Sequence, residues 1–217
     1  MLTQPSSRPT TKEEYAYNLL REEILSCERQ PGQKLVMDRL SEELGTSPIP
    51  IRAALQRLQA EGLVLITPHT GATVSPIAPD TIAEIFTLAA ALESIVMRVL
   101  VVKINPTDLN RLRAIVTALD DALATGDGHA CLTLDYDFHI TLARLSGMAL
   151  LTTFATRTQE SWLRLSRCHF SQAGPQRMAQ AQAEHHQLLT LLAQRDGPAL
   201  EALIVQHNRL SLQAYQR

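Results

Sequence analysis

The sequence predicts a mainly α-helical chain, in which a small N-terminal domain with one β-hairpin precedes an all-helical, antiparallel bundle of about six helices. Apolar residues recur at helical spacing through most of the 217 residues. Strand-like segments, rich in β-branched and apolar residues and separated by a turn, occur only at 63–67 and 72–75. After residue 80 every break between periodic segments contains glycine or proline, and no segment has the pattern of a strand.

These breaks divide the chain into four parts. We expect a polar N-terminal tail over 1–11, a small domain of helices and one hairpin over 12–75 and a Pro-bounded linker over 76–79. The remaining residues, 80–217, are expected to form the helical bundle.

Capping residues define the first two helices. Thr11 followed by Glu14 is the pattern of a capping box, which predicts a first helix over about 12–26. A short second helix should begin with Asp38 as its N-cap and end at Gly45.

A third helix should follow immediately, capped by Ser47 and ended by Gly62. The two strand segments come next, and residues 68–71 between them are typical of a hairpin tip. Three helices and a hairpin in this order are the parts of a winged helix-turn-helix.

The bundle is expected to contain six helices. Their approximate ranges are 80–103, 106–125, 127–145, 148–170, 175–194 and 197–215. The breaks between them are Asn105-Pro106, Gly126-Asp127-Gly128, Gly147, Gly174-Pro175 and Gly197-Pro198.

Composition excludes several classes of protein. Hydrophobic residues make up 45% of the chain and no tract is biased, so a disordered or fibrous protein is excluded. No uncharged apolar run approaches the roughly 18 residues that span a bilayer. The three cysteines are odd in number and widely spaced, which indicates a reducing compartment. We expect a cytoplasmic protein with no membrane partner.

The third helix is the candidate DNA-reading element, because a recognition helix contacts bases with side chains near its N-terminus. Arg52 can reach a guanine edge or a phosphate. The candidate DNA-binding residues are Arg39, Thr46, Ser47, Arg52, Gln56, His69, Thr70 and Gly71. Residues 1–76 carry eight Lys and Arg against nine Asp and Glu, a net charge of −1, so non-specific DNA affinity should be weak.

A second constellation lies in the bundle. Asp135 and His139 are four residues apart on one helix and therefore share a face. His185 and His207 share the faces of their helices with leucines, so both imidazoles should be directed into the bundle. Three imidazoles and a carboxylate suit a divalent metal: zinc is the first expectation, with nickel and manganese as alternatives. A set of separate core histidines, each bonded to a backbone carbonyl, is the competing interpretation.

The N-terminal pattern resembles the DNA-binding domain of GntR-family transcriptional regulators. The matching residues include Pro31-Gly32, Gly45-Thr46-Ser47, Pro50-Ile51-Arg52, Glu61-Gly62-Leu63 and Gly71, spread over about sixty positions. The resemblance implies that Arg52 and Gly71 take part in DNA binding. Two positions depart from the family: Pro48 stands in place of an arginine that commonly contacts the operator, and Ala53 in place of a glutamate.

The bundle resembles the FCD ligand-binding domain, which follows the DNA-binding domain in one branch of the family. The resemblance is to the shorter, six-helix form of the FCD domain. The resemblance rests on Asp135-x-x-x-His139, on Glu184-His185 and on His207, 22 positions after His185. It implies a metal site that also holds a small organic acid. Ala89 and Met148 replace an arginine and an asparagine of the family pattern, and we expect both changes to alter the cavity. Arg157 and Arg164 are the candidates for binding the acid instead.

The expected function is that of a ligand-responsive, DNA-binding regulator, and not an enzyme. We expect a homodimeric repressor that binds a short, nearly palindromic operator, with half-sites about 34 Å apart. Two alternatives stay open: a metal-dependent enzyme acting on small carboxylates, and a helical adaptor that has lost DNA binding.

Overall fold

The computed structural model describes residues 11–216, with the side chains of 170–175 left out. The chain divides into two compact units between Ile77 and Ala78, and each is described by itself.

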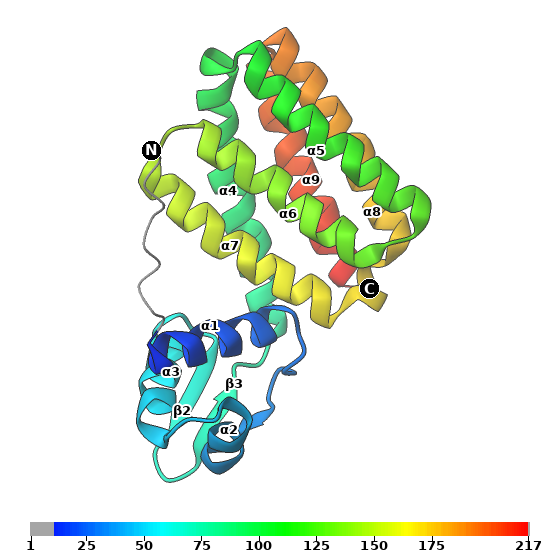
Figure 1. Cartoon of the computed structure of the whole chain (residues 1–217). Helices are drawn as coiled ribbons and strands as arrows, with labels where there is room; N and C mark the ends of the chain where they lie inside the picture. The colour runs from blue at the N-terminus through cyan, green and yellow to red at the C-terminus, as the bar shows by residue number, and fades with distance from the viewer. Residues whose placement is uncertain (1–10, 217) are drawn as a thin grey trace. The chain divides into compact units, whose positions relative to one another are not determined.

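The N-terminal unit has three helices and three short strands (Figure 1). Its elements are α1 (Lys12–Leu25), β1 (Lys34–Leu35), α2 (Met37–Leu44), α3 (Pro48–Ala60), β2 (Val64–Thr67) and β3 (Gly71–Val74). Its core is a single apolar cluster in which Leu20, Ile51 and Leu58 are fully buried. The expected winged helix-turn-helix is confirmed.

The sheet is larger than the sequence predicts. Its strand order is β1-β3-β2, with both pairs antiparallel, so the hairpin gains a third strand through the pairing of Lys34 with Thr73. Because β1 has only two residues, it leaves no alternation that the sequence could reveal. The hairpin tip is as expected, and Gly71 adopts a φ of 101°, which favours glycine.

The capping predictions have mixed outcomes. The hydroxyl of Thr11 accepts a hydrogen bond from the Glu14 backbone N–H at 3.1 Å, and Gly45 ends α2 in the left-handed conformation. The prediction for Asp38 is wrong, since Val36 occupies the N-cap and Asp38 lies within the first turn of α2. There a carboxylate still interacts favourably with the positive end of the helix dipole.

The C-terminal unit is a six-helix bundle (Figure 1). Its helices are α4 (Pro79–Lys103), α5 (Pro106–Thr125), α6 (Gly128–Leu145), α7 (Ala149–Cys168), α8 (Phe170–Gln194) and α9 (Gly197–Tyr215). Helix α4 packs against α9, α7 and α6, while α8 packs against α9 and α5. Side chains from α6, α8 and α9 meet inside this bundle.

Helix α4 is the core helix of this bundle. Among the described residues it is the one helix long and apolar enough to cross a membrane by length and composition. Its buried face, which includes Phe86, Val96, Met97 and Leu100, lies in the protein interior. Packing within the bundle thus accounts for the buried face of α4, which makes up 44% of its apolar window.

The break between the fourth and fifth bundle helices differs from the prediction. Gly174-Pro175 was expected to separate them, but the turn is at His169, and α8 already begins at Phe170. Gly174 and Pro175 therefore lie within the first two turns of α8. Pro175 is the sixth residue of α8, beyond the four whose N–H groups have no partner within the helix, so it removes one intrahelical hydrogen bond from the second turn.

Arg195, the C-cap of α8, also caps the end of α4. Its guanidinium donates hydrogen bonds to the carbonyls of Val101 at 2.9 Å, Val102 at 2.7 Å and Ile104 at 2.9 Å. These carbonyls belong to the last turn of α4 and to its C-cap residue Ile104, where intrahelical donors are lacking.

We expect Arg195→Ala to lower the free energy of unfolding of the bundle by about 1–3 kcal/mol, because it removes charged donors from three carbonyls. Urea denaturation followed by the fluorescence of the single tryptophan, Trp162, measures this. Arg209→Ala, an exposed change on α9, serves as the control. Equal stability of the two variants would show that the α4 cap contributes nothing.

Candidate metal centre and DNA-reading helix

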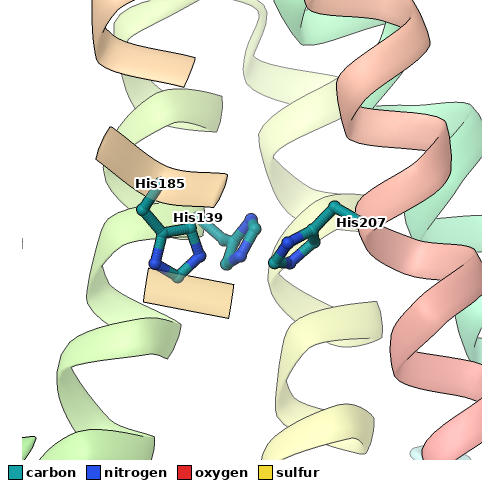
Figure 2. A group of neighbouring side chains, drawn as sticks. All are labelled: His139, His185 and His207. Atoms are coloured by element: carbon teal, nitrogen blue, oxygen red, sulfur yellow. The ribbon is translucent and has the colours of Figure 1, made fainter. Parts of the chain in front are cut away.

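Three histidines from three helices meet inside the bundle. His139 comes from α6, His185 from α8 and His207 from α9, and Figure 2 shows the three rings gathered around one point. One ring nitrogen from each lies within 4.8 Å of the others, and all three side chains are buried. Bonds of about 2.1 Å to a tetrahedral ion place two ligand atoms about 3.4 Å apart, so the rings would move inward when they bind one.

The carboxylate of Asp135 adjoins this group. Its Oδ1 lies 3.5 Å from His185 Nε2, and its Oδ2 lies 3.9 Å from His139 Nε2. Burial is the main cause that raises the pKa of Asp135. A buried carboxylate of this kind is stabilised by a bound cation.

Each histidine has an oxygen beside its other ring nitrogen, Nδ1. His139 Nδ1 lies 2.7 Å from Glu93 Oε1, and His207 Nδ1 lies 2.6 Å from Glu184 Oε2. His185 Nδ1 lies 3.2 Å from the side-chain oxygen of Gln182. At His185 and His207 these partners hold the proton on Nδ1 and leave Nε2 to bind a metal, whereas Glu93 and His139 form an ion-pair contact without hydrogen-bond geometry. The partners are side-chain oxygens, which differs from the backbone carbonyls of the competing interpretation.

The donor set fits a divalent ion. His185 Nε2 is fully buried and has no hydrogen-bond partner among the described residues. Leaving a buried imidazole nitrogen unpaired costs free energy, and a metal ion beside Asp135 would remove that cost.

When no metal is bound, the carboxylate beside His139 favours the protonated imidazolium over the neutral ring. Burial alone lowers the pKa of His139, but the adjacent Glu93 carboxylate outweighs it and raises the pKa to about 9. Burial likewise raises the pKa of Glu93, but His139 lowers it overall. The pKa of His185 is lowered well below its ordinary value, first by burial and then by the neighbouring charges. Metal binding at neutral pH should therefore release a proton from His139.

Arg177 is a residue that sequence reasoning missed. Its guanidinium donates to both carboxylate oxygens of Glu184, at 3.1 and 2.8 Å, and to the His207 carbonyl at 3.0 Å. It also lines a cavity beside the histidines. Neither arginine proposed from the sequence lines that cavity: Arg157 is exposed and Arg164 is buried elsewhere in the bundle. The seven-residue spacing, which places Arg177 and Glu184 on one helix face, was the sequence pattern that could have indicated this ion pair.

The Glu184 carboxylate should make stability depend on pH. Burial raises its pKa, but hydrogen bonds from His207 and Arg177 outweigh that and lower it from 4.5 to about 2. A lowered pKa means that the stabilisation is complete above pH 4.5 and is lost as the pH falls towards 2.

Glu184→Gln in the metal-free protein should therefore cost about 2–3 kcal/mol of unfolding free energy at pH 7 and almost nothing at pH 2. Urea denaturation at both pH values tests this, with Glu201→Gln, a partly exposed change on α9, as the control. A loss that is the same at both pH values would contradict the assigned role of the charge.

Most candidate DNA-binding side chains are accessible. Seven of them are exposed: Arg39, Ser47, Arg52, Gln56, His69, Thr70 and Gly71. Thr46 is different, because its hydroxyl oxygen is buried without a hydrogen-bond partner among the described residues. Ser47 occupies the N-cap of α3, but its side chain accepts no capping hydrogen bond from the helix backbone. Its hydroxyl is therefore available for a contact with DNA.

The first turn of α3 is apolar. It reads Pro48-Ile49-Pro50, and 79% of the Ile49 surface is exposed. Prolines have no backbone N–H, so this helix start offers fewer donors to phosphate than most.

The sequence matches two protein families over nearly its whole length. Residues 12–74 match "Bacterial regulatory proteins, gntR family", and residues 84–210 match "FCD domain". The chain belongs to the GntR family and carries an FCD domain. It is therefore a DNA-binding transcriptional regulator and not an enzyme, and the expected assignment is confirmed.

Curated relatives agree along the whole chain. The HTH-type transcriptional regulator McbR of Escherichia coli is 24% identical over 207 residues, which cover 92% of each chain. The HTH-type transcriptional repressor RspR of Escherichia coli is 25% identical over 191 residues, covering 88% of this chain and 83% of the relative.

Solved structures show the same fold. The structure titled "E. coli McbR/YncC" has a TM-score of 0.76 at 23% identity and covers 95% of this chain and 99% of its own. A GntR regulator structure from Rhodococcus sp. RHA1 has a TM-score of 0.77 at 20% identity and covers 94% and 97%.

Proposed function

We propose that this regulator is a cytoplasmic, homodimeric repressor whose DNA binding is controlled by a small organic acid held on a divalent metal, with zinc as the first candidate. The observation that carries the proposal is the meeting of Asp135 with three buried imidazoles, each of which has a side-chain oxygen beside its Nδ1. The proposed metal ligands are Asp135, His139, His185 and His207. A bound ion would supply Lewis-acid attraction for a carboxylate beside them.

In this proposal, helix α4 transmits a change at the metal centre to the DNA-binding unit. Glu93 of α4 contacts His139, and its carboxylate also accepts hydrogen bonds from Gln159 and Asn208, both at 2.7 Å. Helix α4 follows β3 after only four residues, 75–78. A shift of Glu93 on ligand binding would therefore be passed along α4 to the chain that enters the DNA-binding unit. Such coupling requires that the ligand bind the two conformations with different affinities.

An exposed apolar stripe supports the homodimer. Leu88, Ile95 and Val102 are exposed on α4 at seven-residue intervals, and Leu150 and Phe154 are exposed on α7, which packs beside α4. Apolar residues repeated at this spacing form the seam between packed helices. A second copy of the chain would cover the stripe and bring two DNA-binding units to one operator. The repressor RspR among the relatives supports the proposed sign of regulation.

At the operator, we propose that α3 enters the major groove with Arg52 on a base edge and Ile49 against a thymine methyl group. Apolar side chains discriminate thymine by this contact. The other DNA-binding candidates named above would contact the phosphates and the minor groove.

Replacing that thymine by uracil, which lacks the methyl group, should weaken binding of the unmodified protein about threefold to tenfold and leave Ile49→Ala unaffected. Fluorescence anisotropy with the two duplexes measures this. If uracil at every half-site position leaves the affinity of the unmodified protein unchanged, Ile49 does not read thymine.

Selection of binding sites from random duplex DNA, followed by titration of the selected duplex with zinc and with a chelator, tests the proposed function. We expect a near-palindrome with half-sites about one helical turn apart. Selection of no common sequence would overturn the proposed reader. An unchanged response of the metal-loaded and metal-free proteins to every carboxylic acid would overturn the proposed sensor.

A further inference from the structure

The proposed metal centre forms one wall of a cavity inside the bundle. Asp135, His139 and His207 line it together with Arg177. Its volume is small, about 40 Å³ when measured as the space open to the centre of a water molecule. Its remaining walls are mostly apolar or aromatic. They include Phe86, Leu132, Trp162, Met178, Ala181 and Tyr215.

The two side-chain amide nitrogens in this cavity already have hydrogen-bond acceptors. The side-chain nitrogens of Gln159 and Asn208 both donate to the carboxylate of Glu93. A ligand with several hydroxyl groups would have to break these hydrogen bonds, and it would leave Glu93 buried without its donors.

The hydroxyl groups of the cavity are also engaged. Ser211 donates to the His207 carbonyl at 3.0 Å, and the Tyr215 hydroxyl lies 2.7 Å from the hydroxyl of Ser166. Apart from the proposed metal ligands, most of the wall that a ligand would meet is therefore apolar.

The positive charge of the cavity is likewise neutralised. Arg177 is the one lysine or arginine among the described lining residues, and Glu184 holds its guanidinium with two hydrogen bonds. At Ala89, on the α4 side of the cavity, the chain offers only a methyl group. A second carboxylate on a ligand would thus be buried without a cation, which costs several kcal/mol.

We propose that the effector is a small monocarboxylic acid with an aromatic or branched apolar body. This inference rests on the proposed function, since the metal takes the single carboxylate. The apolar walls at Phe86, Trp162 and Met178 take the rest of the molecule. Dicarboxylic, tricarboxylic and polyhydroxylated acids are disfavoured, because most of the cavity wall is apolar and its one described arginine is already held by Glu184.

Calorimetric titration of the zinc-loaded, full-length protein tests the proposal, with benzoate, succinate and gluconate as probes at equal ionic strength. We expect benzoate to bind at least about tenfold more tightly than the other two acids. Tighter or equal binding of succinate or gluconate would overturn the inference, and so would the binding of none of the three.

The zinc content, measured before the titrations, separates this inference from the function on which it rests. One zinc per chain with no preference for benzoate refutes the effector class alone. A chain that takes up no zinc refutes the proposed metal centre, and the effector class with it.

A matched pair of variants locates the binding site. Met178→Gln places an amide in the apolar wall at nearly constant volume and should weaken benzoate binding about tenfold while one zinc per chain is retained. Met148, which was expected from the sequence to alter the cavity, is exposed and is absent from the cavity lining, so that expectation is wrong for this residue. Met148→Gln therefore makes the same change outside the cavity and should leave benzoate binding unchanged. Equal benzoate affinity of the two variants would place the acid elsewhere.

Discussion

Replacing Arg52 by alanine is expected to abolish specific operator binding while the fold is retained. Arg52 is exposed on α3, one turn from its start, and its side chain makes no hydrogen bond or ion pair within the described part of the chain. Loss of a guanidinium contact to a base edge costs about 1–3 kcal/mol, and a dimer loses it twice. Operator affinity should therefore fall at least about thirtyfold.

Anisotropy titrations with the selected operator and with an unrelated duplex measure this specificity. Arg111→Ala, which removes the same charge from the exposed surface of α5, is the matched control. If Arg52→Ala and Arg111→Ala bind the operator equally well, α3 does not dock as proposed. A loss that is equal on both duplexes would instead assign Arg52 to a phosphate.

The second large effect is expected at the metal centre. His207→Ala removes one of four proposed ligands and leaves Glu184 and Arg177 without the imidazole between them. Zinc affinity should fall at least about a hundredfold, since even the loss of a residue that only supports a ligand costs 10–100-fold. DNA binding should be largely kept, whereas the response to the acid should be lost.

Elemental analysis after dialysis against a weak chelator measures the bound zinc. The matched control is His129→Ala, an exposed histidine in the first turn of α6. An equal zinc content in the His207 and His129 variants would remove His207 from the ligand set.

Local chemistry explains how much of the fold the sequence predicts. The capping hydroxyl of Thr11 and the left-handed residue Gly45 act on their own helices, so both are visible in a short window of sequence. Strand β1 was missed because it exists through its pairing with β3, a partner far away in the chain. The turn at His169, which replaces the expected break at Gly174-Pro175, contains neither glycine nor proline and so carries no breaker signal.

The metal centre and its surroundings were predictable to different degrees. Asp135 and His139 share a helix face by spacing, and the leucines around His185 indicate that its ring is directed inwards. The expectation that these groups meet agrees with the geometry. Arg177 could not be singled out in the same way, because an arginine is directed to a cavity or to solvent by the partners that packing brings, here Glu184.

X-ray absorption at the zinc edge tests the central claim most directly, because it reports the ligand atoms of the bound ion in the full-length protein. We expect three imidazole nitrogens and carboxylate oxygen at about 2.0–2.1 Å from zinc, with a change in the oxygen shell when benzoate is added. Sulfur in the first shell, fewer than three imidazoles, or the absence of stoichiometric zinc would contradict the account.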